Sequence, residues 1–140
     1  FGGYSVFYLA GIHQNRFKSF IAHDGTFNMK SMYGTTEEMW FVNWDMGGPY
    51  WEKNNTAQKS YTDFDPSSKV DQWNTPILIF HGAKDFRVPL GQGLEAFTAA
   101  QSRGIKSKLV VLPEENHWVL TPQNAMVWQR EFYAWLKETL

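Results

Sequence analysis

The chain has 140 residues, of which 43% are hydrophobic and 19% are charged, and its formal net charge at pH 7 is -1. This length fits one domain or less, and the apolar fraction is sufficient for a packed core, which argues against intrinsic disorder. A near-neutral charge without long runs of one sign argues against a nucleic-acid partner and an acidic lipid surface, and no apolar segment is long enough to span a membrane. The absence of cysteine excludes disulfides, cysteine nucleophiles and thiolate metal sites, and leaves the cellular compartment open.

The first third of the chain predicts a helix, a strand and a second helix. An apolar run over residues 3–10, ended by a glycine, predicts the first helix. The short apolar segment 17–23 predicts a strand, and the Asp-Gly pair after it predicts a turn. We expect the second helix to begin at Thr35 or Thr36 and to continue through Phe41, with two glutamates favourably placed in its first turn.

The middle of the chain lacks a periodic pattern. Residues 43–61 predict a loop rich in Trp and Tyr, which contains Gly-Gly-Pro at 47–49 and the pair Asn54-Asn55. An Asp-Pro-Ser-Ser sequence then predicts the start of a short helix over residues 65–73.

The second half alternates strands and helices. Four large apolar residues between a proline and a glycine predict a buried strand over 77–80. A helix over 91–102, a strand over 108–112 and an amphipathic helix over 122–140 follow. Strands that alternate with helices predict an α/β fold, in which helices cover both faces of a parallel sheet.

A sheet of only three strands would leave one edge unpaired and apolar, which is an aggregation hazard. The chain also lacks an initiator Met and opens on Phe1-Gly2-Gly3-Tyr4. Together these observations predict a piece of a longer protein, with further strands before Phe1.

Two side chains with catalytic chemistry follow neighbouring strands. Asp85 comes just after the strand over 77–80, and His117 comes after the strand over 108–112. Because the carboxyl ends of parallel strands share one edge of the sheet, we expect both side chains in one crevice. An acid that orients a histidine forms two-thirds of a nucleophilic triad.

The third member of such a triad is expected upstream. In α/β-hydrolases the chain order is nucleophile, acid, histidine, and the nucleophile lies on a sharp turn with the pattern G-x-S-x-G. A serine directly before Phe1 would make Phe1 the residue after the nucleophile and Gly2 the closing glycine. We therefore expect the nucleophile to precede Phe1 in the parent protein.

The chain carries four motifs in a fixed order: FGGY at 1–4, TPILIFHG at 75–82, DFRVP at 85–89 and ENH at 115–117. Together they resemble the catalytic domain of the prolyl oligopeptidase family of serine peptidases, most closely its acylaminoacyl-peptidase and dipeptidyl-peptidase V branch. The resemblance covers nearly the whole chain. It implies the C-terminal part of an α/β-hydrolase fold, preceded in the parent by the remaining strands, the nucleophile and a β-propeller domain.

The resemblance also implies roles for individual residues. Asp85 is the triad acid and His117 the general base, while the backbone N–H of Phe1 belongs to the oxyanion hole. Arg87 holds a carbonyl of the substrate backbone near the scissile bond, a task that suits a permanently charged guanidinium. From spacing alone, Arg87 is better explained by a pair with a surface acid.

The segment 36–40 resembles the wall of the pocket for the residue before the scissile bond, which assigns Met39 and Trp40 to substrate binding. The family usually has an aromatic residue at the position of Met39. The pocket is expected to prefer an apolar side chain, and Trp118 is expected near the same cleft.

Some residues are rivals for these roles. Asp24 also follows a strand and is the alternative acid. Ser5 is the alternative nucleophile, although Phe7 stands where the tight turn needs a glycine. The other histidines are expected to be packed, at the surface or supporting: His13, His23 and His81. Glu114 and Glu115 are expected to lie in a solvated loop.

The sequence thus favours a serine-type peptidase that releases dipeptides or short peptides from peptide N-termini through an acyl-enzyme, with a peptide substrate and without a metal or organic cofactor. Two alternatives remain. One is a carboxylesterase of the same fold. The other is a non-catalytic fragment that forms a homo-oligomer or binds its complementary N-terminal half. The family resemblance favours a periplasmic or secreted location.

Overall fold

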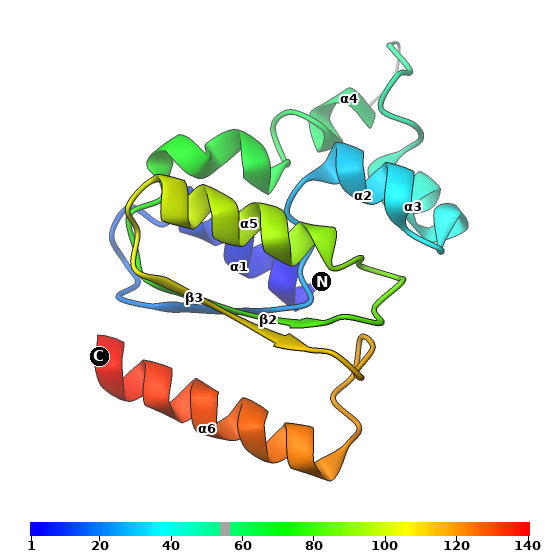
Figure 1. The fold of residues 1–140 in the computed structure, drawn as a ribbon. Coiled ribbons are helices and arrows are strands. Elements are labelled where there is room, and N and C mark those ends of the chain that lie inside the picture. The colour runs from blue at the N-terminus through cyan, green and yellow to red at the C-terminus, as the bar shows by residue number, and fades with distance from the viewer. Residues whose placement is uncertain (54–56) are drawn as a thin grey trace.

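A computed structural model describes residues 1–53 and 57–140 as a three-stranded parallel sheet with helices on both sides (Figure 1). The strand order in the sheet is β1-β2-β3, the same as the order along the chain, and β2 is the central strand. Along the chain the elements are α1 (Gly2–Ala10), β1 (Phe20–His23), α2 (Met29–Thr35), α3 (Met39–Met46), α4 (Ala57–Ser60), the 3-10 helix η1 (Pro66–Gln72), β2 (Ile77–Gly82), α5 (Gly91–Ser102), β3 (Ser107–Leu112) and α6 (Pro122–Thr139). The predicted α/β class and parallel sheet are confirmed.

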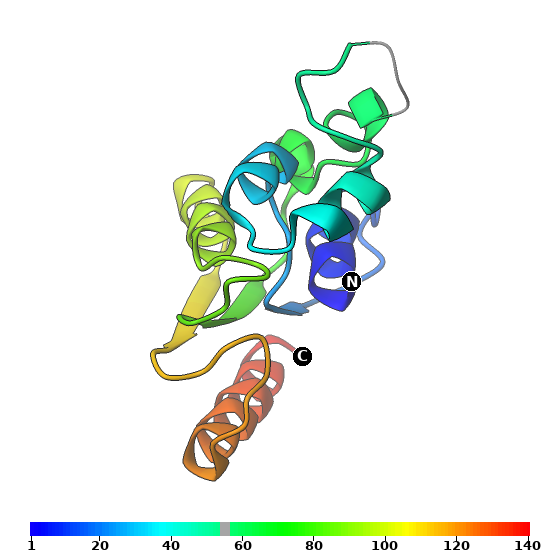
Figure 2. The same ribbon diagram turned by 90° about the vertical axis from the view of Figure 1, so that its right-hand side faces the viewer.

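The central strand β2 explains the layered arrangement. All of its residues are buried, and consecutive side chains point to opposite faces of the sheet. Ile77 and Ile79 pack with α1 and α5, whereas Leu78 and Phe80 pack with α6. Figure 2 shows the result: α6 lies alone on one side of the sheet, and α1 and α5 lie on the other. A strand buried on both faces needs a continuous apolar run, and such a run marked this strand in the sequence.

Helix α1 is seated on β1 by a pair of glycines. A Cβ atom on Gly3 would lie within 2.7 Å of the backbone of Gly25, and a Cβ atom on Gly25 would be equally close to Gly3. The two backbones can therefore touch only because both residues lack a side chain. This contact places the N-terminus of α1 beside the carboxyl end of β1, at the edge of the sheet where chemistry was expected.

Between β1 and β2 the chain forms a small helical cap that the sequence predicted only in part. Helix α2 was not expected; the side chain of Asn28 caps it by accepting hydrogen bonds from the backbone N–H groups of Lys30 and Ser31. The next helix begins at Met39 rather than near Thr35, so the expected cap at Thr35 or Thr36 is wrong.

The expected loop over 43–61 is also partly wrong, because α3 continues to Met46 and α4 covers Ala57–Ser60. The pair Asn54-Asn55 lies outside the described residues. The short helix expected at 65–73 is confirmed as η1, and Asp65 caps it by accepting a hydrogen bond from the N–H of Ser67. None of the described helices has the length and apolar character needed to cross a membrane.

Candidate active site

Asp85 lies in the turn after β2 and is almost completely buried. One carboxylate oxygen, Oδ1, accepts a hydrogen bond of 2.8 Å from the backbone N–H of Val88, and the other, Oδ2, lies 2.6 Å from Nδ1 of His117. The backbone N–H of Asp85 in turn donates to the carbonyl of Gly82. Both oxygens are therefore engaged, and the carboxylate has a fixed orientation.

His117 lies after β3, as expected, and its ring meets Asp85 across the carboxyl edge of the sheet. A carboxylate only accepts hydrogen bonds, so Nδ1 of His117 carries the proton and Nε2 is left with a free lone pair in the neutral ring. The hydrogen bond that His117 donates to Asp85 is the main reason why the pKa of His117 is raised above its ordinary value of 6.5. About a quarter of the His117 side chain is exposed, so the ring can meet a substrate.

The loop that carries His117 approaches β2 very closely. A Cβ atom on Gly82 would overlap the carbonyl oxygen of Asn116 and would lie 2.7 Å from that of Glu115. The carbonyl of Glu115 also accepts a hydrogen bond of 2.9 Å from the backbone N–H of Lys84, directly beside Asp85. His117 can thus come within hydrogen-bonding distance of Asp85 because residue 82 is a glycine and has no side chain.

The side chain of Glu115 contradicts the prediction of a solvated loop. It is buried, and its carboxylate accepts hydrogen bonds from the backbone N–H groups of Leu120 and Thr121 and from the side chain of Asn124. Hydrogen bonds from Thr121, Asn124 and Leu120 lower the pKa of Glu115 to about 2. Glu115 therefore ties the His117 loop to the first turn of α6, while the neighbouring Glu114 is exposed and pairs with Lys84, as expected for a surface loop.

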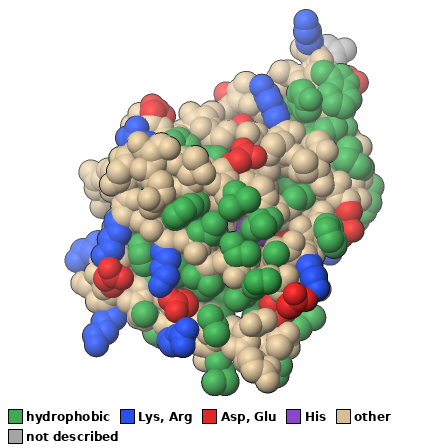
Figure 3. Space-filling model, in the orientation of Figure 1, with side chains coloured by type: hydrophobic (Ala, Val, Ile, Leu, Met, Phe, Trp, Pro, Cys, Tyr) green, Lys and Arg blue, Asp and Glu red, His purple; other side chains and the backbone are tan. Residues whose placement is uncertain are grey.

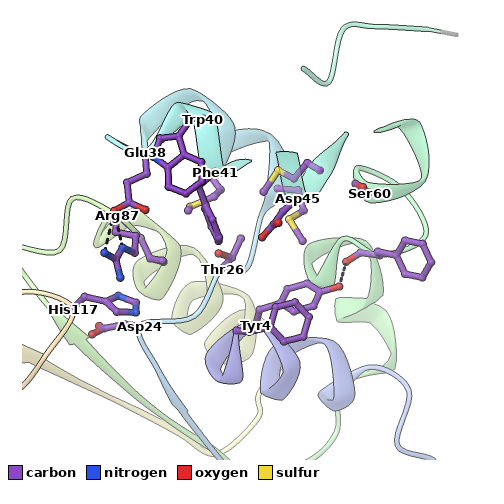
Figure 4. Close-up of a pocket in the computed structure, with 16 residues that line it drawn as sticks. Tyr4, Asp24, Thr26, Glu38, Trp40, Phe41, Asp45, Ser60, Arg87 and His117 are labelled. Atoms are coloured by element: carbon purple, nitrogen blue, oxygen red, sulfur yellow. Dashed lines mark hydrogen bonds and ion pairs between the residues drawn. The ribbon is translucent and has the colours of Figure 1, made fainter. Parts of the chain in front are cut away.

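A cavity of about 620 Å³ opens beside His117, between α1, α2 and α3 (Figure 4). Its walls are largely apolar and include Met29, Met32, Phe41, Met46 and Val88. Phe1, at the N-terminus of α1, also lines it, so the first residue of the chain and the histidine share one cavity. A concave, mostly apolar site with a few polar groups is typical of a ligand-binding pocket.

Arg87 lies at the rim of this cavity and is paired. Its Nε donates to Oε1 of Glu38 at 3.0 Å, and one terminal nitrogen lies 3.0 Å from the same oxygen. The structure therefore confirms that Arg87 pairs with an acid, Glu38, as its spacing in the sequence favoured. Arg87 also lines the cavity together with His117, and its contact with a substrate stays a prediction.

The wall contributed by α3 differs in detail from the expectation. Trp40 lines the cavity and is strongly exposed, at 74%. Met39 is not among the lining residues, and Phe41 takes part in the wall instead. Trp118 lies beside His117 on neighbouring grooves. Phe41 was missed because the resemblance covered only the segment 36–40, which ends one residue before it.

The rival acid Asp24 is occupied by other partners. Its Oδ1 accepts a hydrogen bond of 2.9 Å from the N–H of Gly82, and its Oδ2 lies 2.9 Å from Nε2 of His23. The indole N–H of Trp128 donates to Nδ1 of His23, so the neutral His23 keeps its proton on the nitrogen that faces Asp24. Asp24 lines the cavity but is held in a network between β1, β2 and α6 rather than against Nδ1 of His117.

The remaining candidate residues have other partners. The Ser5 hydroxyl donates to the carbonyl of Phe1 within α1, as expected for an ordinary helix residue. His13 follows α1 and contacts Thr75. His81, Asp24 and Asp85 offer ligand atoms within 4.8 Å of one another, as a metal site would. Each of the three makes a hydrogen bond to the backbone, and Nδ1 of His81 is buried without a hydrogen-bond partner among the described residues.

Comparison with known proteins adds independent information. The model of the prolyl oligopeptidase family matches residues 1–140. The dipeptidyl-peptidase 5 of Porphyromonas gingivalis is 53% identical over 141 residues, which cover all of this chain and 20% of that protein. The dipeptidyl-peptidase 5 of Aspergillus fumigatus is 36% identical and is covered to 19%. The chain thus spans about a fifth of the length of the curated relatives it matches.

A solved structure shows the same fold. The acylaminoacyl peptidase of Pyrococcus horikoshii superimposes with a TM-score of 0.85 over 99% of this chain and 22% of that one. The sequences are only 18% identical, so the likeness concerns the fold: an α/β-hydrolase sheet with the same arrangement of helices.

Proposed function

This chain belongs to the prolyl oligopeptidase family, and we propose from that premise that it is the C-terminal part of the catalytic domain of a serine-type peptidase. In the full-length protein the remaining strands, the nucleophilic serine and a propeller domain would precede Phe1. The observation that carries the proposal is the 2.6 Å contact between Asp85 and His117 at the rim of an apolar cavity. The names of the relatives and the family match support the reaction class.

The chemistry follows from the proton positions. His117 Nε2 takes the proton of the serine hydroxyl as the serine oxygen attacks the peptide carbonyl, and Asp85 stabilises the imidazolium that forms. The carbonyl oxygen becomes an oxyanion, which the backbone N–H of Phe1 stabilises. His117 then gives its proton to the leaving amine, and the acyl-enzyme is hydrolysed by a water that His117 activates in the same way.

We assign the substrate class from the cavity and the relatives. The apolar walls suit an apolar residue before the scissile bond, with Trp40 and Phe41 on one side and Arg87 at the rim. The relatives named dipeptidyl-peptidase 5 suggest the release of dipeptides from peptide N-termini. Met39 keeps a predicted role in substrate binding only at the outer surface of α3, because it does not line the cavity.

The test uses the full-length protein and chromogenic dipeptidyl anilides with an apolar residue at the scissile bond. Asp85→Asn should lower kcat by about 10⁴-fold, because a carboxamide no longer holds the correct tautomer of His117. Asp71→Asn is the matched control, since Asp71 is exposed and its carboxylate accepts a hydrogen bond from the side chain of Gln72. Full activity of Asp85→Asn, or an equal loss in Asp24→Asn, would contradict the assignment of the acid. Turnover of esters with the same acyl group, but not of the anilides, would identify a carboxylesterase instead.

A further inference from the structure

One polar side chain of the central strand is completely buried and only half satisfied. His81 is the single polar side chain of β2, and its exposed fraction is 0%. Its Nδ1 lies against α5, on the side of the sheet that α1 and α5 cover (Figure 2), since a Cβ atom on Gly93 would lie 2.6 Å from it. This nitrogen has no hydrogen-bond partner among the described residues. Burying a polar atom without a partner costs stability, and an apolar residue at this position would avoid that cost.

The other ring nitrogen of His81 explains why a histidine stands there. Nε2 lies 2.8 Å from the carbonyl oxygen of Val88, and Oδ1 of Asp24 is farther away, at 3.7 Å. Both neighbours are acceptors, so Nε2 of the neutral ring carries the proton and donates a hydrogen bond to the carbonyl. The backbone N–H of the same Val88 donates to Oδ1 of Asp85 at 2.8 Å. Val88 thus connects the buried ring of His81 to the carboxylate that faces His117.

The turn after β2 is held at three successive carbonyl groups. The segment 36–37 binds the carbonyls of Phe86 and Arg87 through a backbone N–H and a hydroxyl. His81 binds the next carbonyl, that of Val88, from within the sheet. Among the described residues no other group donates to this carbonyl, so loss of the histidine would leave a buried acceptor unpaired. Val88 would then shift, and with it the N–H that fixes the triad acid.

We propose that His81 is a positioning residue of the active site, which fixes through Val88 the orientation in which Asp85 meets His117. The inference rests on the proposed peptidase function and deepens it. His81 does not line the cavity, so it acts on the reaction only through its neighbours. The carboxylate has two oxygens, and the one that Val88 holds determines where the other points. Removing the donor at position 81 should therefore weaken the hydrogen bond between Asp85 and His117.

The experiment compares three forms of the full-length protein on an apolar dipeptidyl anilide: wild type, His81→Leu and His81→Gln. Leucine removes the donor, whereas the side-chain amide of glutamine can place an N–H close to the position of Nε2. His81→Leu should lower kcat by about 10- to 100-fold, because the acid and the base lose their alignment. It should also move the midpoint of the pH profile down toward 6.5, because the bond to Asp85 is the main cause of the raised pKa of His117. His81→Gln should restore most of kcat and the wild-type midpoint. The other charges that act on His117, Asp24 and Arg87, are kept in all three forms.

A histidine that only stabilises the fold predicts a different result. His81→Leu would then lower the amount of folded protein, while the folded fraction kept the midpoint of the wild type. That result, or equal losses in the leucine and glutamine variants, would overturn the proposal. If His81→Leu does not fold, His81→Asn takes its place, because this shorter amide does not reach the position of Nε2.

Gly93 offers a test that keeps the histidine. A methyl group on Gly93 would press on Nδ1 at 2.6 Å, so the ring of His81 must move and its bond to Val88 must lengthen or bend. Gly93→Ala should therefore also lower kcat and the midpoint. Gly91→Ala, in the same helix, is the matched control, because a Cβ atom there meets nothing within 4 Å. A midpoint that is unchanged in Gly93→Ala, or lowered equally in both variants, would contradict the role of the ring.

The pKa of His117 can also be measured without catalysis. Hydrogen–deuterium exchange at the C2 position of each imidazole, followed by mass spectrometry, titrates the histidines of the full-length protein one by one. The pKa of His117 should be lower in His81→Leu than in the wild type and in His81→Gln. If this difference holds but no anilide is cleaved, the peptidase function is wrong and the positioning role is right. If anilides are cleaved and His117 titrates alike in all three forms, the peptidase function stands and the positioning role is wrong.

Discussion

His117 can accept a proton on Nε2 only in the tautomer that carries its own proton on Nδ1. The neighbouring Asp85 selects this tautomer. Asp85 is fixed by the backbone N–H of Val88 on one oxygen and offers the other oxygen to Nδ1 of His117. The second histidine of the region, His23, is fixed in the opposite sense, because Trp128 donates to its Nδ1 and leaves the proton on Nε2. The two rings are of one residue type but differ in function, because their hydrogen-bond partners differ.

The pH dependence of activity follows from the pKa of His117. Asp85 raises this pKa above 6.5, and catalysis needs the neutral ring, so kcat/KM of the full-length protein should fall as the pH drops through a midpoint above 6.5. In Asp85→Asn the remaining activity should have a lower midpoint. A wild-type midpoint below 6.5, measured on an anilide with no titratable group in this range, would contradict the hydrogen bond as the dominant influence.

The raised pKa of His117 also makes the stability of the folded protein depend on pH, with more stabilisation at lower pH. Because the pKa of folded His117 is raised, its contribution to stability is complete below about pH 6.5, where the ring is charged in both states. The contribution is lost as the pH rises through the folded-state pKa. Loss of activity at acid pH is therefore not explained by unfolding at this residue.

At the scale of elements, the sequence predicted those helices and strands that have a periodic pattern of apolar residues. The strands β2 and β3 and the helices α5 and α6 each show an apolar pattern with a clear start and end, and the structure confirms them. The first strand is also present, but it begins at Phe20 rather than at Phe17. Helix α2 was missed, although Asn28 before Met29 was an available N-cap signal. Glu115 was misjudged for a different reason. Its partners come from the chain after His117, and nothing in the spacing shows that the loop folds back over the carboxylate.

The close approach of the His117 loop to β2 predicts the effect of Gly82→Ala. The added methyl group would overlap the carbonyl of Asn116, so the loop must move and His117 must draw away from Asp85. We expect the full-length variant to lose about 1–3 kcal/mol of stability and to lose activity beyond what that destabilisation explains. Stability is measured by chemical denaturation, and kcat on the folded fraction.

Gly91→Ala is the matched control for this substitution. A Cβ atom on Gly91, at the start of α5, would meet nothing within 4 Å. Because alanine favours helix over glycine, this variant should be neutral or up to about 1 kcal/mol more stable, with unchanged activity. If Gly82→Ala kept the kcat of the wild type, the close approach of the His117 loop to β2 would not be needed for activity.

The hydrogen bonds of Glu115 lead to a second prediction about the loop that carries His117. Glu115→Ala removes the acceptor for two backbone N–H groups and for Asn124, so the segment between His117 and α6 loses its fixed path. A displacement of His117 by about 1 Å would lower kcat by up to about 100-fold. Glu115→Gln keeps part of the acceptor capacity and should fall between wild type and alanine. Glu114→Ala should behave as wild type, since Glu114 is exposed; equal effects at 114 and 115 would contradict the positioning role.

At the scale of the whole molecule, the site lies where three layers meet. The sheet supplies Asp85 and His117 at its carboxyl edge, α1 brings Phe1 to the same edge, and the cap formed by α2 and α3 closes the cavity above them. Hydrophobic side chains gather in the middle of the face shown in Figure 3, and charged ones lie mostly toward its rim. The parallel sheet and the acid–histidine pair could be predicted from sequence, because strands alternate with helices and the carboxyl ends of neighbouring parallel strands share one edge. The cavity wall could not, because it depends on how α2 and α3 turn over the sheet.

The free edge of β1 predicts how this chain behaves on its own. The N–H groups of Phe20 and Asp24 donate to β2, so in the alternation of a strand those of Ile21 and His23 point away from the sheet. In the described residues no strand covers this edge, and an open edge pairs readily with another chain. The isolated 140-residue chain should therefore form dimers or larger species in sedimentation velocity at micromolar concentration. A polypeptide that contains the strands proposed to precede Phe1 should convert these species into a one-to-one complex, because it would supply a strand to pair with β1. A sharp monomer boundary for the isolated chain, unchanged by that polypeptide, would show that β1 is a protected edge.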